Sequence, residues 1–118
     1  MSKSKDAIPL DKLGLFNKLI AVNPKIERKG KTMPYTSVNG HMFSFLDKDG
    51  SMGLRLSDED RKKFIDKYKA KLMVQYGRVL KEYVVVPPEL LEDTQTLSVY
   101  LQKSYDYILT FKPKPGKK

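Results

Sequence analysis

A chain of 118 residues that is 40% hydrophobic and 31% charged has the size and composition of one globular domain and is too short for two separate cores. It contains no cysteine, which excludes a disulfide framework and a thiolate zinc site. No apolar run approaches the roughly 20 residues that span a bilayer, and the N-terminus lacks the apolar centre of a signal peptide. The sequence therefore predicts a cytoplasmic protein without membrane contact.

The formal net charge is +9, and much of it lies at the two ends of the chain. We expect flexible basic tails over residues 1–9 and 113–118, flanking a single domain over 10–112. Six lysines lie in or beside these tails, so +9 less six leaves +3 for residues 6–111. They are Lys3, Lys5, Lys112, Lys114, Lys117 and Lys118. The body is only mildly basic, which favours solubilising tails over a DNA-reading arm.

Apolar residues at helical spacing predict three helices. The first covers residues 10–23 and ends before Pro24, because a residue that precedes proline avoids the α region. The second begins at Ser57, an N-cap hydroxyl followed by three acidic residues in the first turn. The third begins at Asp93 or Thr94, either of which can cap it.

Two β-prone runs, residues 32–38 and 41–46, are separated by Asn39 and Gly40. This dipeptide tolerates positive φ at both centres of a two-residue turn, so it predicts a β-hairpin. Side chains alternate in the second run, and we expect Phe43 and Phe45 to share one face of the sheet.

Three further strands complete the predicted sheet. Residues 52–56 form one strand, and residues 72–76 and 81–86 form two more about a bend at Gly77-Arg78. Pro87 and Pro88 end the last strand because proline cannot donate to a ladder, and they can start a short helical turn.

The segment from residue 47 to 58 begins like a calcium-binding loop. Asp47 and Asp49 supply oxygen atoms at its first and third positions, as an EF-hand requires. Met52 stands where that loop needs glycine, however, and the flanking residues are typical of β-strands. Asp, Lys and Gly50 are favoured in turns for reasons unrelated to metal, so we predict a hairpin turn.

The residues that could support catalysis are few. His41 is the one histidine, and without cysteine it has no usual nucleophile or second imidazole to pair with. The serines offer no strand-to-helix nucleophile elbow, and no glycine-rich loop precedes a helix. We therefore expect no enzymatic activity, no catalytic residues, no metal and no cofactor.

The predicted order is helix, three strands, helix, two strands, helix, which indicates an α+β domain with helices packed on an antiparallel sheet. This order and several short sequence segments resemble the N-terminal domain of the TfoX, or Sxy, competence regulators. The resemblance covers roughly residues 10–113. The segments that carry it are ERKGKTMPYTSVNGHMFSFL, GLRLSDEDRKKF, LKEYVVVPPELLED and LSVYLQKSYDYI.

The resemblance implies a fold similar to type III secretion chaperones and YjbR-type proteins. Full-length TfoX carries a second, helical C-terminal domain and acts as a coactivator of competence genes, and this chain ends before such a domain, as in small stand-alone relatives. The family supplies no established catalytic residues. The matching features are structural: the Asn39-Gly40 turn, a sheet edge at residues 83–86 and the Pro87-Pro88 corner.

The preferred functional hypothesis is a regulatory or adaptor-like domain that binds a protein through a sheet edge or face, and it allows a homodimer. Its support is the resemblance, together with aromatic side chains beyond the needs of one core: Tyr35, Tyr83, Tyr100, Tyr105 and Tyr107. The simpler interpretation is that the rings of these tyrosines cover the core while their hydroxyl groups face water.

The alternative hypothesis is a nucleic-acid-binding protein that uses a basic face, chiefly Arg28, Lys29, Lys31 and Arg55. It requires these cations to converge in space. The candidate interaction surface for both hypotheses consists of Arg28, Lys29, Lys31, Tyr35, His41, Arg55, Arg78, Lys81 and Tyr83.

Overall fold

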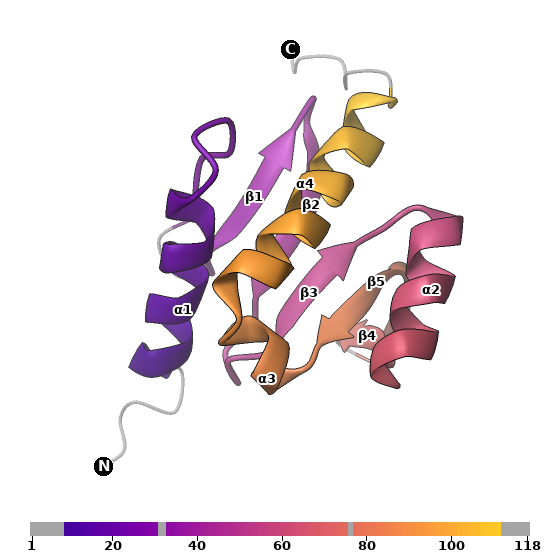
Figure 1. Ribbon diagram of the computed structural model, residues 1–118, viewed down its shortest axis with the longest axis horizontal. Coiled ribbons are helices and arrows are strands. Elements are labelled where there is room, and N and C mark those ends of the chain that lie inside the picture. Colours follow the sequence, from indigo (N-terminus) through magenta and orange to yellow (C-terminus); the bar gives the residue numbers. More distant parts are fainter. Residues whose placement is uncertain (1–8, 31–32, 76, 112–118) are drawn as a thin grey trace.

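The computed structural model describes residues 9–30, 33–75 and 77–111, in which four helices and five strands form an α+β domain (Figure 1). The elements are α1 Leu10–Ala21, β1 Tyr35–Val38, β2 His41–Leu46, β3 Met52–Arg55, α2 Asp58–Tyr68, β4 Leu72–Gln75, β5 Arg78–Val86, α3 Pro88–Leu91 and α4 Thr94–Leu109. The predicted fold class is confirmed. No helix in the described ranges is long and apolar enough to cross a membrane.

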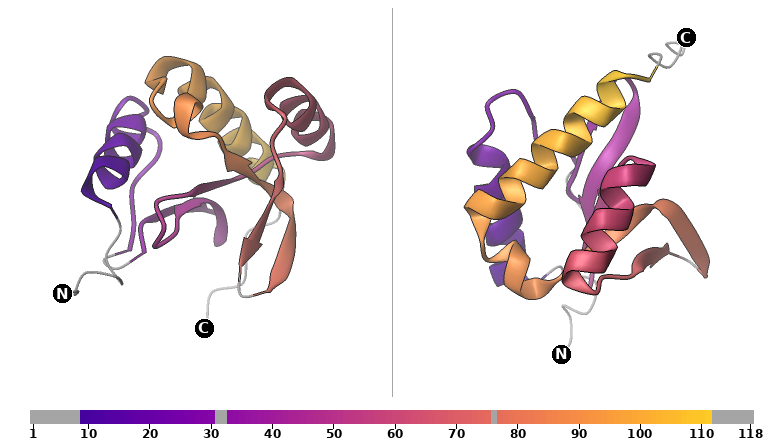
Figure 2. Two further views of the ribbon diagram at one scale, coloured as in Figure 1. Left: turned by 90° about the horizontal axis from the view of Figure 1, so that it is seen from below. Right: turned by 45° about the vertical axis from the view of Figure 1, so that its right-hand side comes forward.

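The five strands form one antiparallel sheet in the order β1-β2-β3-β5-β4. All the helices lie on the same side of it (Figure 2). The predicted sheet edge at residues 83–86 is wrong, because this half of β5 pairs with β3 on one side while Leu72 of β4 pairs with Val84 on the other. The edge strands are β1 and β4.

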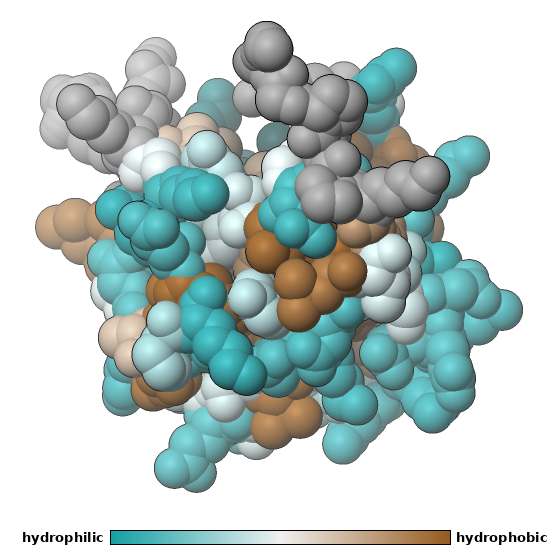
Figure 3. Space-filling model, turned by 90° about the horizontal axis from the view of Figure 1, so that it is seen from above, coloured by the Kyte–Doolittle hydropathy of each residue, from teal (hydrophilic) through white to brown (hydrophobic). Residues whose placement is uncertain are grey.

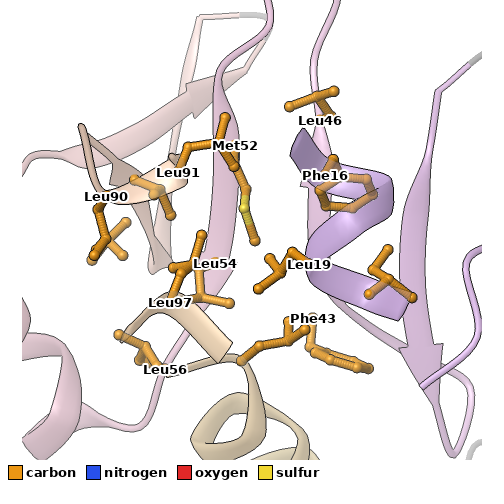
Figure 4. Packing of buried hydrophobic residues seen from close by; sticks show 14 of the residues in the cluster. Phe16, Leu19, Phe43, Leu46, Met52, Leu54, Leu56, Leu90, Leu91 and Leu97 are labelled. Carbon is orange, nitrogen blue, oxygen red and sulfur yellow. The ribbon is translucent and has the colours of Figure 1, made fainter. Parts of the chain in front are cut away.

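The main core lies between the helices and the covered face of the sheet (Figure 4). Phe16 and Leu19 of α1 belong to this core together with Phe43 and Leu54 of the sheet, and all four are fully buried. Each such side chain contributes on the order of 1.5–3 kcal/mol to stability when it is removed from water. This core fixes the positions of the strands that carry the candidate site.

The predicted turns and caps are present. Asn39 and Gly40 have φ values of 56° and 80°, as a two-residue hairpin turn requires. The Ser57 hydroxyl caps α2 by accepting a bond from the Asp60 amide at 3.3 Å. The cap of α4 is Asp93 and not Thr94, since the Asp93 carboxylate accepts a hydrogen bond from the backbone N–H of Thr96. Pro88, after Pro87, starts α3.

The segment that resembles a calcium loop is a hairpin turn, as predicted. Asp47 Oδ1 accepts the backbone N–H groups of Asp49 and Ser51, both at 2.9 Å, and Gly50 has a φ of 84°. The Asp58 carboxylate forms an ion pair with Arg61 in the first turn of α2. Within the described ranges there is no cluster of three or more His, Asp or Glu residues that could hold a metal ion.

The predicted alternation along β2 is wrong because the strand contains an irregularity. Thr36 pairs with Ser44, whereas Ser37 pairs with Met42, so Phe43 has no partner in β1. An inserted residue of this kind shifts the side chains on one side of it to the opposite face. Phe43 therefore packs in the main core, and Phe45 packs in a separate cluster on the other face.

The β4–β5 hairpin bends away from the other three strands (Figure 2). Leu72 pairs with Val84, but the next residue, Met73, pairs with Leu80, so residues 81–83 have no partner in β4. This break lets the start of β5 turn out of the sheet while its end continues to pair with β3. Gln75, near the hairpin tip, donates from Nε2 to the Asp47 carboxylate at 3.4 Å.

Candidate binding groove

The face of the sheet that the helices leave open carries its own small hydrophobic cluster. Phe45, Met73 and Tyr83 are buried there, and Tyr35, Leu80 and Val85 pack partly buried against them. The cluster joins the bent hairpin to the β1–β2–β3 part of the sheet. The hairpin therefore forms a wall that stands over the open face.

Between this wall and the first two strands lies a groove of about 340 Å³. Such a volume is at the low end of the range for ligand sites. The described residues that line it, hereafter the groove, are Met33, Tyr35, Met42, Phe45, Gln75, Arg78 and Leu80. Their thioether, aryl and aliphatic groups suit an apolar partner, and their amide and guanidinium groups suit a hydrogen-bond acceptor or an anion.

The buried side of the groove depends on a close contact between Phe45 and Gly53. The two residues are cross-strand neighbours in β2 and β3. A Cβ atom at Gly53 would lie 2.7 Å from both Cε2 and Cζ of the Phe45 ring, well inside ordinary contact distance. The absence of a side chain at Gly53 therefore lets the ring lie flat against the sheet, with only 5% of Phe45 exposed.

A polar cluster beside the groove holds Arg55 in place. Its Nε atom lies 2.6 Å from a carboxylate oxygen of Glu82, and its guanidinium lies 4.9 Å from the Phe111 ring centroid. The Tyr107 hydroxyl donates to the second oxygen of Glu82 at 3.2 Å. The Arg55 charge is thus balanced within the domain, and the side chain has little freedom to reach a partner.

Tyr83, another residue of the predicted interaction surface, belongs to this cluster and makes structural contacts there. It is only 8% exposed, and its hydroxyl donates to the Met42 carbonyl oxygen at 2.8 Å. Burial raises the pKa of the Tyr83 phenol to about 12. The phenol therefore keeps its proton and can donate the hydrogen bond to Met42.

The other tyrosines of the protein-binding hypothesis either pack against the main core or line the groove. Tyr100, Tyr105 and Tyr107 pack partly buried against the main core, as the simpler interpretation expects, and Tyr35 is the one that lines the groove. Large apolar residues exposed elsewhere are Leu10, Val22, Val74, Val79, Val99 and Leu109. Seen from above, hydrophobic residues reach the surface in small patches separated by hydrophilic ones (Figure 3).

The predicted cations fall in different surroundings. Arg78 lines the groove, is exposed, and has no acidic partner in the part of the chain that the structure describes. Lys81 is exposed in a neighbouring hollow that Arg55 and Leu80 also line. Arg28 is exposed on the loop before β1, and Lys31 lies outside the described residues.

Lys29 and His41 have structural contacts. Lys29 forms both backbone hydrogen bonds of a bridge with Tyr35, at 2.8 and 3.0 Å, and its Nζ donates to the Ser37 hydroxyl. It therefore covers part of the free edge of β1. His41 packs edge-on against the Phe111 ring, with centroids 5.0 Å apart.

Sequence reasoning missed five of the groove residues that the structure brings together: Met33, Met42, Phe45, Gln75 and Leu80. The only local signal was for Met42, an apolar residue close to the Asn39-Gly40 turn. The fold and the groove together define a small α+β domain with one helix-covered sheet face and one uncovered face that carries an apolar groove. Comparison of the chain with family models, curated proteins and solved structures found no match.

Proposed function

We propose that this chain is a cytoplasmic regulatory or adaptor-like protein-interaction domain of the TfoX N-terminal type, and that its partner binds in the groove. The observation that carries the proposal is the apolar lining of the groove on the uncovered sheet face. Methionine, tyrosine, phenylalanine and arginine are enriched at protein interfaces, and all four occur in this lining.

Binding through the sheet face is favoured over binding through the β1 edge. A peptide that adds to an edge strand needs unpaired backbone groups, and Lys29 already occupies those of Tyr35. On the opposite face, the helices and the main core fill the space over the strands. The groove is accordingly better supported as a docking position than the β1 edge or the helix-covered face.

The test is an affinity capture of binding partners by the full chain. It compares the wild type with two matched variants. Met42 is 37% exposed in the groove and Val99 is 55% exposed on α4, so each can be changed to glutamate with little effect on folding. We expect Met42→Glu to lose a partner that both the wild type and Val99→Glu retain. A partner retained equally by Met42→Glu would refute the assignment to the groove, provided that circular dichroism shows the same folded spectrum.

The second candidate function is nucleic-acid binding, and it is favoured by the exposed cations Arg28, Arg78 and Lys81. Fluorescence anisotropy of labelled duplex and single-stranded DNA across a salt series tests it. Affinity that falls steeply with salt, and that falls further in Arg28→Glu and Lys81→Glu, would favour this candidate because phosphate binding releases counterions. Binding that does not depend on these residues would count against it.

A further inference from the structure

We infer that the groove binds a peptide segment in which an apolar side chain lies next to a carboxylate. This inference rests on the proposed function and specifies the chemistry of the partner. It combines the apolar lining of the groove with the position and free charge of Arg78.

The apolar part of the partner would contact residues from both sides of the groove. Met33 and Met42 lie on the β1–β2 side and Leu80 on the hairpin side, while the Phe45 ring is almost fully buried between them. Methionine side chains are flexible and adapt to irregular apolar surfaces, as at other peptide-binding sites. An aliphatic or aromatic side chain of a peptide is therefore the matching anchor.

The carboxylate would meet Arg78. A guanidinium presents paired N–H donors that match the two oxygens of a carboxylate. Arg78 is exposed and has no acidic partner in the described ranges, whereas the charge of Arg55 is already balanced by Glu82 at 2.6 Å. Exposed Lys81, three residues along the same strand, adds to the positive potential.

The position of Arg78 is defined by the hairpin. It pairs across the strands with Gln75, whose side-chain amide donates to the Asp47 carboxylate of the β2–β3 turn. This contact holds the hairpin tip near the sheet, so that the guanidinium remains at the lining of the groove. A peptide with its anchor between the walls would then place a neighbouring carboxylate near Arg78.

The lining favours an acidic peptide over a nucleic acid. Nucleic-acid affinity depends on several phosphate contacts made by clustered cations. Among the described residues the groove lining contains a single cation, set among apolar side chains. One cation beside an apolar surface matches one carboxylate beside an apolar anchor.

The test measures anisotropy of short fluorescein-labelled peptides with the purified full chain. Three sets are compared: Asp/Glu with Leu/Phe, Lys/Arg with Leu/Phe, and Asp/Glu with Ser/Gly. We expect the wild type to prefer the acidic apolar set. Arg78→Glu should weaken that set by on the order of tenfold and shift the preference towards the basic apolar set, because the charge is reversed. Arg28→Glu, a matched change outside the groove lining, should keep the wild-type preference.

Circular dichroism of every variant shows whether it is folded, and Arg78→Gln replaces Arg78→Glu if the latter is not. Preference of the wild type for the basic apolar set, equal binding of the acidic set without apolar residues, or an unchanged preference in the Arg78 variant would each overturn the inference. So would competition by oligo-dT single-stranded DNA that abolishes peptide binding, or failure of all three sets to bind. These outcomes leave the proposed function standing if Met42→Glu still loses its protein partner.

Discussion

Gly53→Ala tests whether the position of the Phe45 ring depends on the absence of a side chain at residue 53. The new Cβ atom would lie 2.7 Å from two ring carbons, whereas carbon atoms normally rest about 3.5–4.0 Å apart. The ring must therefore move by roughly 1 Å, away from β3 and into the groove. Overpacking of this kind costs about 1–3 kcal/mol in the free energy of unfolding.

The same substitution should be harmless once the ring is gone. In a Phe45→Leu background, Gly53→Ala loses the clash and gains roughly 0.5–1 kcal/mol, because alanine restricts the unfolded strand more than glycine does. Urea unfolding of the wild type, both single variants and the double variant gives the coupling energy, which we expect to be at least about 1 kcal/mol. Equal costs in the two backgrounds, within about 0.5 kcal/mol, would show that the ring does not depend on Gly53.

Three further predictions concern buried polar groups. Thr94→Val should raise the free energy of unfolding by up to about 1 kcal/mol, because Thr94 Oγ1 is buried without a hydrogen-bond partner among the described residues; a lower urea midpoint would contradict this. Ser104→Ala should lower the free energy of unfolding by about 1–3 kcal/mol, because the buried Ser104 hydroxyl donates its one hydrogen to the carbonyl oxygen of Arg55, with that of Phe43 3.4 Å away; an unchanged midpoint would count against this bond. The contribution of Tyr83 to stability should be constant below pH 10.0 and be lost as the pH rises to about 12, since the raised pKa of Tyr83 favours the neutral phenol in the folded state. Tyr83→Phe should make the fall of stability with pH shallower in urea melts at alkaline pH, and the same slope in both proteins would exclude Tyr83 as its source.

Features that depend on a few neighbouring residues could be predicted from the sequence. The Asn39-Gly40 turn follows from which residues tolerate positive φ, and the start of α2 follows from the capping hydroxyl of Ser57. The short helix α3 follows from the fixed φ of Pro88. Such features need no information about the rest of the chain.

Strand order could not be predicted, because it depends on pairing between distant segments. The family resemblance implies an edge at residues 83–86, yet they pair with β3 and contact β4 as well. Their nearly continuous apolar character, Val84 to Val86, is typical of a strand buried on both faces and is the signal in the sequence for an internal position.

The groove was hidden from sequence reasoning by two irregularities. The unpaired Phe43 in β2 changes the face on which Phe45 lies, and the break at residues 81–83 bends the hairpin over that face. A pattern of alternating residues contains neither event. Sequence alone also treats Arg55 and Arg78 as equal cations, although of these two only Arg55 is paired with a carboxylate of the described residues.

The buried apolar residues are divided unequally between the two faces of the sheet: Phe45, Met73 and Tyr83 form the groove-side cluster, and the much larger set belongs to the main core. The hairpin tip is therefore held by less buried surface than the sheet, and it opens at a lower free energy than the whole domain unfolds. We expect the amide hydrogens of Val79 and Leu80 to exchange with solvent sooner than those of Leu54 and Val84. Since a bound partner would slow only the first pair, amide exchange reports occupancy of the groove whatever the chemical nature of the molecule that fills it.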